Sequence, residues 1–288
     1  MQTLNKTRYL PVTILILLLS LTTHANPGDL YAISGAGGAS DDPSPSTLYQ
    51  INPSTGAVIA TIGATGQMRL TGLAMHPATG VLYAVESHRG SGKKLHSLNK
   101  TTGMATEIGD TDSQIPDIAF DSSGTLFGWS EDGDDLVTIN LTTGLATKVG
   151  ESGIATRATG LAFNSADALF LFDGKNLRTL NPNTGLGTSF VFLGEVFNNS
   201  LAFNSTDVLY AIQRTGGTTL LKTVDVTTGA ITDIGDIGVA KISAIAFEPG
   251  SLVEPVPTLT EWGICTLILV LAGAAFLHVR KLQLAPVA

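Results

Sequence analysis

An all-β fold is predicted by three features of this 288-residue sequence. Glycine occurs 32 times, which indicates many tight turns, and only 14% of the residues are charged. A Thr-Gly dipeptide recurs at spacings of 47, 41, 41 and 44 residues, without helical periodicity between the copies. The five copies begin at Thr55, Thr102, Thr143, Thr184 and Thr228.

A second phrase keeps the same period and supplies strands for each unit. Its copies are GLAM at Gly72, DIAF at Asp117, GLAF at Gly160, SLAF at Ser200 and AIAF at Ala244. Short runs such as VLYAV, KLHSLN and ATEIG follow, bounded by Gly, Pro, Asn or Ser, as is typical of strands. Four runs per unit, A to D, predict one four-stranded antiparallel blade of a β-propeller, with strand A lining the central channel.

The ends of the repeat region predict how the ring closes. The first unit starts at strand B, DLYAIS (Asp29–Ser34), and the last strand A, AIAFE (Ala244–Glu248), has no strand B after it. Pairing these two strands closes a ring and hides sheet edges from water. We therefore predict a five-bladed β-propeller over residues 26–249, closed by the N- and C-terminal strands.

The recurring turn has a local explanation in the phrase INPSTG. Asn52 is expected to cap the turn through its side chain, Pro53 fixes φ near −65°, and Gly56 takes a positive φ as the chain re-enters the sheet. A residue other than glycine at that position costs about 1–2 kcal/mol.

The N-terminal segment predicts export. Lys6 and Arg8 precede the apolar run 12–21, and Thr23-His24-Ala25 fits a cleavage site, so residues 1–25 are interpreted as a secretory signal peptide. An uncleaved membrane anchor is the alternative, although the apolar run is shorter than the roughly 20 residues of a bilayer span. The single cysteine, Cys265, lies outside the repeats, so the predicted domain has no disulfide.

The charge balance excludes a nucleic-acid partner. Lys and Arg number 16 against 24 Asp and Glu, which gives a net charge of −8. Binding to phosphate backbones needs a basic face.

The loops of the propeller predict where a ligand binds. The A–B turns (HPATG, DSSG, NSAD, NSTD) are short and alike, and with the C–D turns they share one face. The variable segments, such as SHRGSGKK, SEDGDD and GDTDSQIP, are all B–C or D–A connections on the other face. Variation gathered on one face of a rigid scaffold is typical of a binding surface.

The D–A connections place one residue of each blade at the expected rim of the channel. Three of the five are basic, which favours an anionic or sugar-acid ligand. The alternative interpretation is that they form ion pairs with Asp117, Glu151 or Asp236. The aligned residues are Arg69, Gln114, Arg157, Phe197 and Lys241.

No resident metal or cofactor is predicted. The acidic run EDGDD (Glu131–Asp135) raises the question of calcium, but it lacks the glycine and distal glutamate of an EF-hand loop, and Asp41-Asp42 fits no better. Both are interpreted as solvated turns, with calcium as the alternative.

The support for catalysis in the sequence is thin. His76 aligns with turn-capping residues, and His96 lies within a strand C. Glu86, His88 and Arg89 remain as a candidate general-base cluster, without an accompanying nucleophile motif. A binding function is therefore favoured over an enzymatic one.

The C-terminal segment predicts a membrane helix. After a linker at 250–255, VPTLTEWG is followed by the apolar run 264–279 and by Arg280-Lys281. The run is about long enough for a span, Trp262 suits the interface, and the basic pair is expected to stay cytoplasmic.

This segment resembles the IPTL-CTERM sorting signal of Gram-negative bacteria, a relative of PEP-CTERM signals. The resemblance covers residues 256–281, with the tail 282–288 beyond it. It implies an exosortase-type membrane protease as partner, transient inner-membrane anchoring, and delivery to the cell surface or extracellular matrix. The residues that carry it are Pro257, Thr258, Leu259, Trp262 and Gly263.

The repeats are similar to secreted bacterial propellers of the NHL/YVTN type, a resemblance that implies fold rather than function. The sequence thus predicts an exported, surface-sorted binding module, with an envelope protein or an envelope or biofilm polysaccharide as ligand. The alternatives are a lactonase-like propeller hydrolase or lyase with calcium at the channel mouth, and a purely structural surface-layer repeat.

Overall fold

The computed structural model describes residues 28–35, 44–87, 93–154, 160–194 and 200–249. The predicted signal peptide, linker, sorting segment and tail therefore lie outside the described residues. Within the described ranges, no helix is long and apolar enough to cross a membrane.

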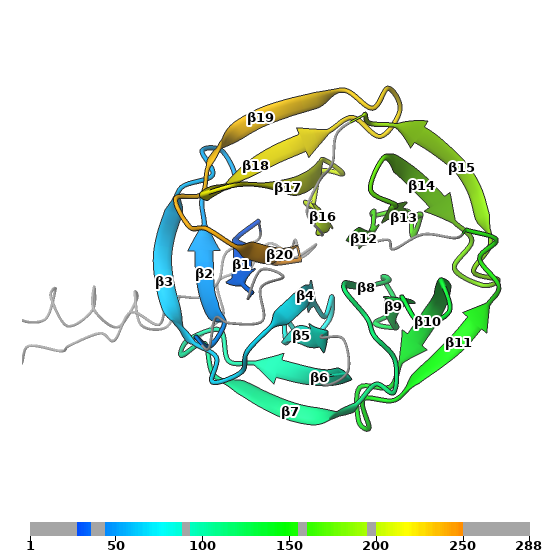
Figure 1. Cartoon of the computed structure of the whole chain (residues 1–288), viewed down its shortest axis with the longest axis horizontal. Helices are drawn as coiled ribbons and strands as arrows, with labels where there is room; N and C mark the ends of the chain where they lie inside the picture. Colours follow the sequence, from blue (N-terminus) through cyan, green and yellow to red (C-terminus); the bar gives the residue numbers. More distant parts are fainter. Residues whose placement is uncertain (1–27, 36–43, 88–92, 155–159, 195–199, 250–288) are drawn as a thin grey trace, which may run out of the picture.

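The described residues form five four-stranded antiparallel sheets around a central axis, as the sequence predicts (Figure 1). The sheet at the closure contains β20 (Ile242–Phe247), β1 (Leu30–Ser34), β2 (Thr47–Ile51) and β3 (Val58–Ala64). The second contains β4 (Leu70–Met75), β5 (Leu82–Ser87), β6 (Lys93–Leu98) and β7 (Ala105–Asp110). The third contains β8 (Ile118–Phe120), β9 (Leu126–Ser130), β10 (Asp135–Ile139) and β11 (Ala146–Gly150). The fourth contains β12 (Gly160–Phe163), β13 (Leu169–Phe172), β14 (Asn176–Leu180) and β15 (Gly187–Phe192). The fifth contains β16 (Leu201–Phe203), β17 (Leu209–Thr215), β18 (Thr218–Val224) and β19 (Ile231–Asp236).

The predicted closure of the ring is confirmed. Strand β1 pairs antiparallel with β20, and Leu30 faces Phe247 while Ile33 faces Ala244. Lys100, in the C–D turn of the second blade, binds both carboxylate oxygens of Glu248 at 2.8 Å. The closure blade is thereby tied to its neighbour.

The core lies between the blades, where aromatic side chains of neighbouring sheets interlock. The ring centroids of Phe163 and Phe127 lie 5.2 Å apart, and those of Phe203 and Phe170 are at the same distance. In both pairs the last residue of an innermost strand packs against strand B of the preceding blade. Burying one such ring stabilises the fold by about 1.5–3 kcal/mol.

Two features of the structure explain the recurring glycine of the C–D turn: its backbone conformation and a close contact between blades. Gly103 has φ of 81°, as expected, and Asn99 caps its turn by accepting hydrogen bonds from two backbone amides. In addition, a Cβ at Gly103 would lie 2.5 Å from the carbonyl oxygen of Gly63 on the outer strand of the preceding blade. The glycine therefore allows two blades to approach each other, a role that the turn sequence alone did not indicate.

Candidate functional site

The central channel is lined by the edges of the five innermost strands. Strands β4, β8, β12, β16 and β20 each pair with a neighbour on one side only, so the other edge of each strand faces the axis (Figure 1). Alternate residues of an edge strand direct their N–H and C=O groups away from the partner strand. The channel is therefore lined by backbone groups, although the residues themselves are mostly apolar.

One carboxylate is buried at the start of an innermost strand. Asp117, directly before β8, is 1% exposed, and its Oδ2 accepts a hydrogen bond from the amide of Leu161 at 3.0 Å. Gly72 allows the backbones of two innermost strands to approach each other, since a Cβ at Gly72 would lie 2.8 Å from Cα of Asp117. The equivalent residue of the fourth blade is also glycine, Gly160.

Burial dominates the ionisation of Asp117. Enclosure away from water raises the pKa of this carboxyl group well above its usual value, and backbone amides, including those of Leu161 and Ile118, partly oppose the shift. Its Oδ1 has no hydrogen-bond partner among the described residues.

The mouth formed by the D–A and B–C connections contains the residues predicted as a binding rim. The backbone carbonyl of Arg69 accepts a hydrogen bond from the amide of the last residue of strand B, at 3.4 Å. The carbonyls of Gln114 and Lys241 each accept one from the amide of the residue directly after strand B, at 2.9 Å in both cases. These three residues therefore occupy equivalent positions, as the alignment predicts. Arg157 and Phe197 lie outside the described residues.

The backbone of two rim residues is unusual. Arg69 has φ of 61° and Lys241 has φ of 67°, a left-handed conformation that costs a side-chain-bearing residue about 1–2 kcal/mol. Such strain at equivalent positions supports a functional hypothesis for these two cations.

The three carboxylates considered as ion-pair partners of the rim have other contacts. Asp117 is enclosed, and its Oδ2 accepts a hydrogen bond from the amide of Leu161. Glu151 binds Lys148 at 2.5 Å, and Asp236 accepts a hydrogen bond from Thr218. The ion-pair interpretation of the rim stays a prediction beside the ligand-binding one.

The other sequence-predicted groups on this face fall into separate contacts. Asp132, from the acidic run, binds Lys93 at 2.7 Å, and Asp135 binds Lys148 at 2.7 Å. Glu86 lies 3.7 Å from Nε2 of the fully buried His96, whereas His88 and Arg89 of the candidate general-base cluster are not described. In the described part of the chain, no three His, Cys, Asp or Glu side chains come together as a metal site.

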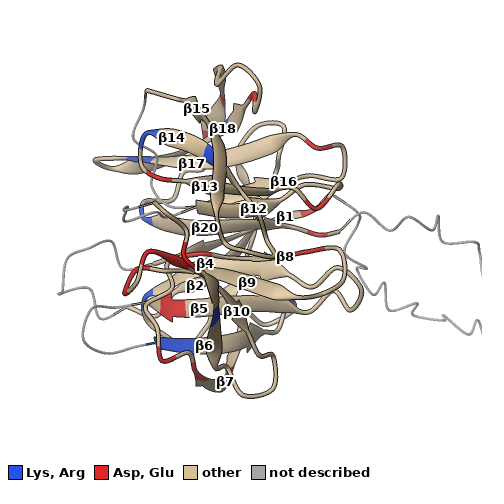
Figure 2. Ribbon diagram, turned by 90° about the vertical axis from the view of Figure 1, so that its right-hand side faces the viewer, with Lys and Arg blue, Asp and Glu red and all other residues tan. Residues whose placement is uncertain are grey.

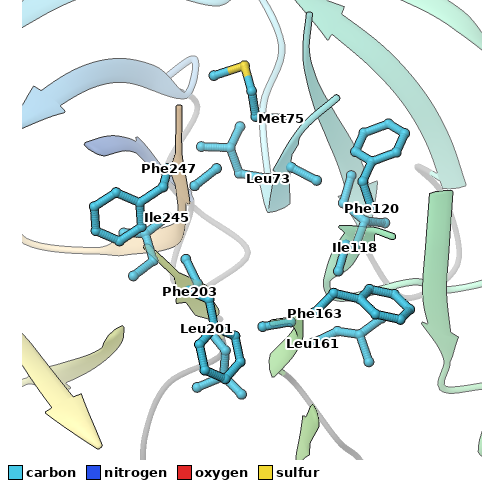
Figure 3. A pocket seen from close by; sticks show the side chains of 15 residues that line it. Leu73, Met75, Ile118, Phe120, Leu161, Phe163, Leu201, Phe203, Ile245 and Phe247 are labelled. Atoms are coloured by element: carbon cyan, nitrogen blue, oxygen red, sulfur yellow. The ribbon is translucent and has the colours of Figure 1, made fainter. Parts of the chain in front are cut away.

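The opposite mouth, formed by the A–B turns, contains an open bowl of about 310 Å³. Its floor is made by the last residue of each innermost strand. These residues also line a smaller pocket next to the bowl, and Figure 3, which shows that pocket, shows their side chains directed away from the axis. This arrangement leaves the centre of the bowl free. The floor residues are Met75, Phe120, Phe163, Phe203 and Phe247.

The rim of the bowl carries hydroxyl, amide and carboxylate groups. Asp167 accepts hydrogen bonds from the amide and hydroxyl of Ser122 at 2.8 and 2.6 Å, and Asp207 holds Ser165 in the same way. These contacts join the A–B turns of neighbouring blades. Lys and Arg are absent from the described residues that line the bowl.

Some polar groups at the bowl are available to a ligand. The amide oxygens of Asn164 and Asn204 cap their own turns, at 2.8 and 2.9 Å from the amides of Ala168 and Val208. Among the described residues no partner is recorded for the Nδ2 groups of these two side chains or for the hydroxyl of Ser205, which also lines the bowl.

The charges of the two faces differ. In the side view of Figure 2, the arrowhead of β5 marks the left-hand edge as the B–C face, and the basic segments that are visible lie there and in the middle. Acidic segments are visible at both edges, whereas no basic segment is visible at the right-hand edge, where the A–B turns lie. The bowl therefore suits a neutral ligand better than an anionic one.

Sequence reasoning missed the bowl because its turns are uniform. A signal for it was present: four of the five strand-A phrases end in phenylalanine, at Phe120, Phe163, Phe203 and Phe247. An apolar residue that recurs at the end of a channel-lining strand predicts an apolar ring at that mouth.

Comparisons with known proteins add no functional assignment. No protein-family model matches the chain, and no curated protein matches it. It is similar in structure to a protein of unknown function from Bacteroides thetaiotaomicron, with TM-score 0.48 and 13% identity over 80% of this chain and 66% of that one. Glutaminyl cyclase from Myxococcus xanthus has TM-score 0.45 and 19% identity over 59% and 71% of the two chains. Virginiamycin B lyase from Staphylococcus aureus has TM-score 0.38 and 13% identity over 57% and 54%. At these values the likenesses carry no argument about ligand or activity.

Proposed function

We propose that this protein is an exported β-propeller that binds a carbohydrate at the bowl and acts as a surface-sorted interaction module. The observation that carries the proposal is the cavity of about 310 Å³ with an apolar floor and a polar rim. Ligand sites are typically apolar pockets with a few placed polar groups. A sugar ring has apolar C–H faces and hydroxyl edges, which match this arrangement.

The size of the bowl selects the kind of carbohydrate. Small-molecule sites begin at roughly 300 Å³, so the bowl admits one sugar unit at a chain end rather than several units side by side. The donors at the rim, Nδ2 of Asn164 and Asn204, suit hydroxyl or acetyl oxygens. The ligand class is therefore the neutral terminal sugar of an envelope or biofilm polysaccharide.

Binding is better supported than catalysis at this mouth. A hydrolase or lyase needs a carboxylate or imidazole directed at the substrate, whereas the carboxylates of Asp167 and Glu248 are engaged by Ser122 and Lys100. The side chain of His76 also caps its own turn. Its Nδ1 accepts hydrogen bonds from the backbone amides of Ala78 and Thr79, at 3.2 and 3.3 Å.

A glycan array on the purified full chain tests the bowl. Ser205→Trp places a large side chain at the lining of the bowl, and Ala166→Trp is the matched control, since Ala166 is an exposed A–B turn residue outside the lining. Signals from neutral glycans are expected to disappear in S205W and to persist in A166W. Loss in both variants or in neither would contradict the proposal.

The opposite rim is the site of a second, anionic ligand in this proposal. The left-handed backbone of Arg69 and Lys241 supports it, together with their equivalent positions in adjacent blades. Arg69→Ala/Arg157→Ala is expected to weaken binding of acidic polysaccharide, measured at low and high salt, because screening reduces the contribution of exposed charges. Lys175→Ala, an exposed cation of a B–C turn, is the control, and an equal loss there would remove the rim from the proposal.

The route to the cell surface is the remaining part of the proposal. Residues 1–25 direct export, and the segment 256–281 anchors the chain in the inner membrane until an exosortase-type protease processes it. Pro257→Ala/Trp262→Ala is expected to leave the chain in the inner-membrane fraction. Normal release of this variant would contradict the sorting role.

A further inference from the structure

The channel contains a second cavity, of about 90 Å³, next to the bowl, with which it shares the last residue of each innermost strand (Figure 3). Three residues from each innermost strand line it. Asp117 lies beside this cavity, since its carboxylate accepts a hydrogen bond from the amide of Leu161, one of the lining residues. A chamber of this size holds a small ion and a few water molecules.

Five equivalent backbone amides, one from each innermost strand, form a ring near the Asp117 carboxylate. The amide of Leu161 donates to Oδ2 of Asp117 at 3.0 Å. Burial raises the pKa of this carboxyl group, and the amides of Leu161, Ile118, Leu201 and Leu73 oppose the shift. The equivalent amide of the closure blade, that of Ile245, donates to Oγ of Ser200 at 3.1 Å.

A ring of carbonyl oxygens follows the amide ring along the axis. In a β-strand the N–H and C=O of one residue point to the same side, and these residues lie on strands that pair on one side only. Because all five strands run from the D–A face to the A–B face, their carbonyls lie next to the carboxylate on the cavity side. The chamber thus offers one carboxylate and five carbonyl oxygens.

The Asp117 carboxylate has an incomplete set of partners. Its Oδ1 is buried without a hydrogen bond among the described residues, although the residue is only 1% exposed. An enclosed carboxylate without full compensation is unfavourable, and a cation or a bound proton removes the cost.

We propose that a Ca²⁺ ion binds on the axis, between Asp117 and the backbone carbonyls of Leu73, Ile118, Leu161, Leu201 and Ile245. Ca²⁺ accepts six to eight oxygen ligands and often has five of them in one plane, which a five-bladed ring supplies. Mg²⁺ requires octahedral geometry and fits a five-fold ring poorly. Because every blade contributes one oxygen, the ion fastens the ring from its centre.

Calorimetric titration of the full chain with CaCl₂, after treatment with a chelator, tests the site. We expect one ion per chain and a higher Tm in Ca²⁺. Asp117→Asn is expected to lower the affinity by roughly 10–100-fold or more. Asp135→Asn is the matched control, because Asp135 is also buried, at 6% exposure, with an unpartnered Oδ1, but lies on strand β10 away from the axis.

Three results would overturn the assignment: no saturable binding of one Ca²⁺ per chain, unchanged affinity in D117N, or equal stabilisation by Na⁺ or K⁺ alone. If D117N does not fold, the wild-type protein decides, because saturable binding of one Ca²⁺ per chain and a higher Tm in Ca²⁺ than in Na⁺, K⁺ or Mg²⁺ are required.

Discussion

The two mouths of the channel differ in their loops and in what they offer to a ligand. At the A–B mouth the turns are nearly alike, yet they surround a bowl of about 310 Å³ whose described lining residues include no Lys or Arg. At the other mouth the loops vary in length and sequence, and two cations, Arg69 and Lys241, are held in left-handed backbone. The difference teaches that loop variation and a formed cavity are separate signals, which here point to opposite ends of one channel.

The uniformity of the A–B and C–D face has a packing cause. Asp167 and Asp207 join successive A–B turns through Ser122 and Ser165. On the same face each C–D turn approaches an outer strand of the preceding blade, as Gly103 approaches Gly63. Selection for these contacts keeps the turns alike whether or not they bind a ligand.

The largest effect on stability is expected from a substitution at the C–D turns of the uniform face. Gly103→Val places a Cβ 2.5 Å from the carbonyl of Gly63 and forces a branched residue to φ of 81°, so we expect a loss of about 2–4 kcal/mol in the free energy of unfolding. Gly216→Ala is the control, because no atom lies within 4 Å of its Cβ position. Equal urea midpoints for the two variants would show that the interblade contact does not matter.

A smaller effect is expected at the A–B turns. Hydrogen bonds from the hydroxyl and then the amide of Ser165 lower the pKa of the Asp207 carboxyl group. Asp207→Asn is expected to lose about 0.5–1 kcal/mol at pH 7, a small value because the group is exposed. Asp112→Asn, at another exposed aspartate with positive φ, is expected to change little.

The pH dependence of the Asp207 effect follows from the sign of its shift. Since the folded-state pKa lies below the unfolded value of about 3.9, the stabilisation is fully present above that pH and is lost as the pH falls through the folded pKa. Urea unfolding at pH 7 and pH 3 measures it. A larger difference between wild type and D207N at pH 3 than at pH 7 would contradict this account.

The smallest effect on stability is expected at the variable face, from a substitution of Arg69. Arg69→Gly removes the left-handed strain, which is about 1–2 kcal/mol, and adds a backbone entropy cost of about 0.5–1 kcal/mol. The net expectation is a stability equal to or slightly above that of the wild type, together with weaker binding of acidic glycans. A clear fall in Tm would show that Arg69 is held for stability and not for a ligand.

Most of the fold could be predicted from the sequence because its signals are local and repeated. The Thr-Gly turns, the strand-A phrases and the unpaired end strands were sufficient for five blades and their closure, as the pairing of β1 with β20 confirms. The capping of the C–D turns by Asn52 and its equivalents could also be predicted, because it involves residues two positions apart, Ser54 and Asn52.

The candidate sites were less accessible to sequence reasoning because they depend on contacts between blades. Asp117 occupies the same position as Gly72 and Gly160, and only the structure shows that its carboxylate is buried against the amide of Leu161 in the next blade. The bowl likewise requires that the rings of Phe163 and Phe203 lean between blades, which opens the centre (Figure 3). The equivalence of Arg69 and Lys241 was predicted, but their backbone strain was not.

One glycan array with three proteins tests most directly whether the two mouths are separate binding sites. The account predicts that Ser205→Trp loses only neutral glycans and that Arg69→Ala/Arg157→Ala loses only acidic glycans, relative to the wild-type chain. Loss of the same glycans in both variants, or of none in S205W, would contradict it.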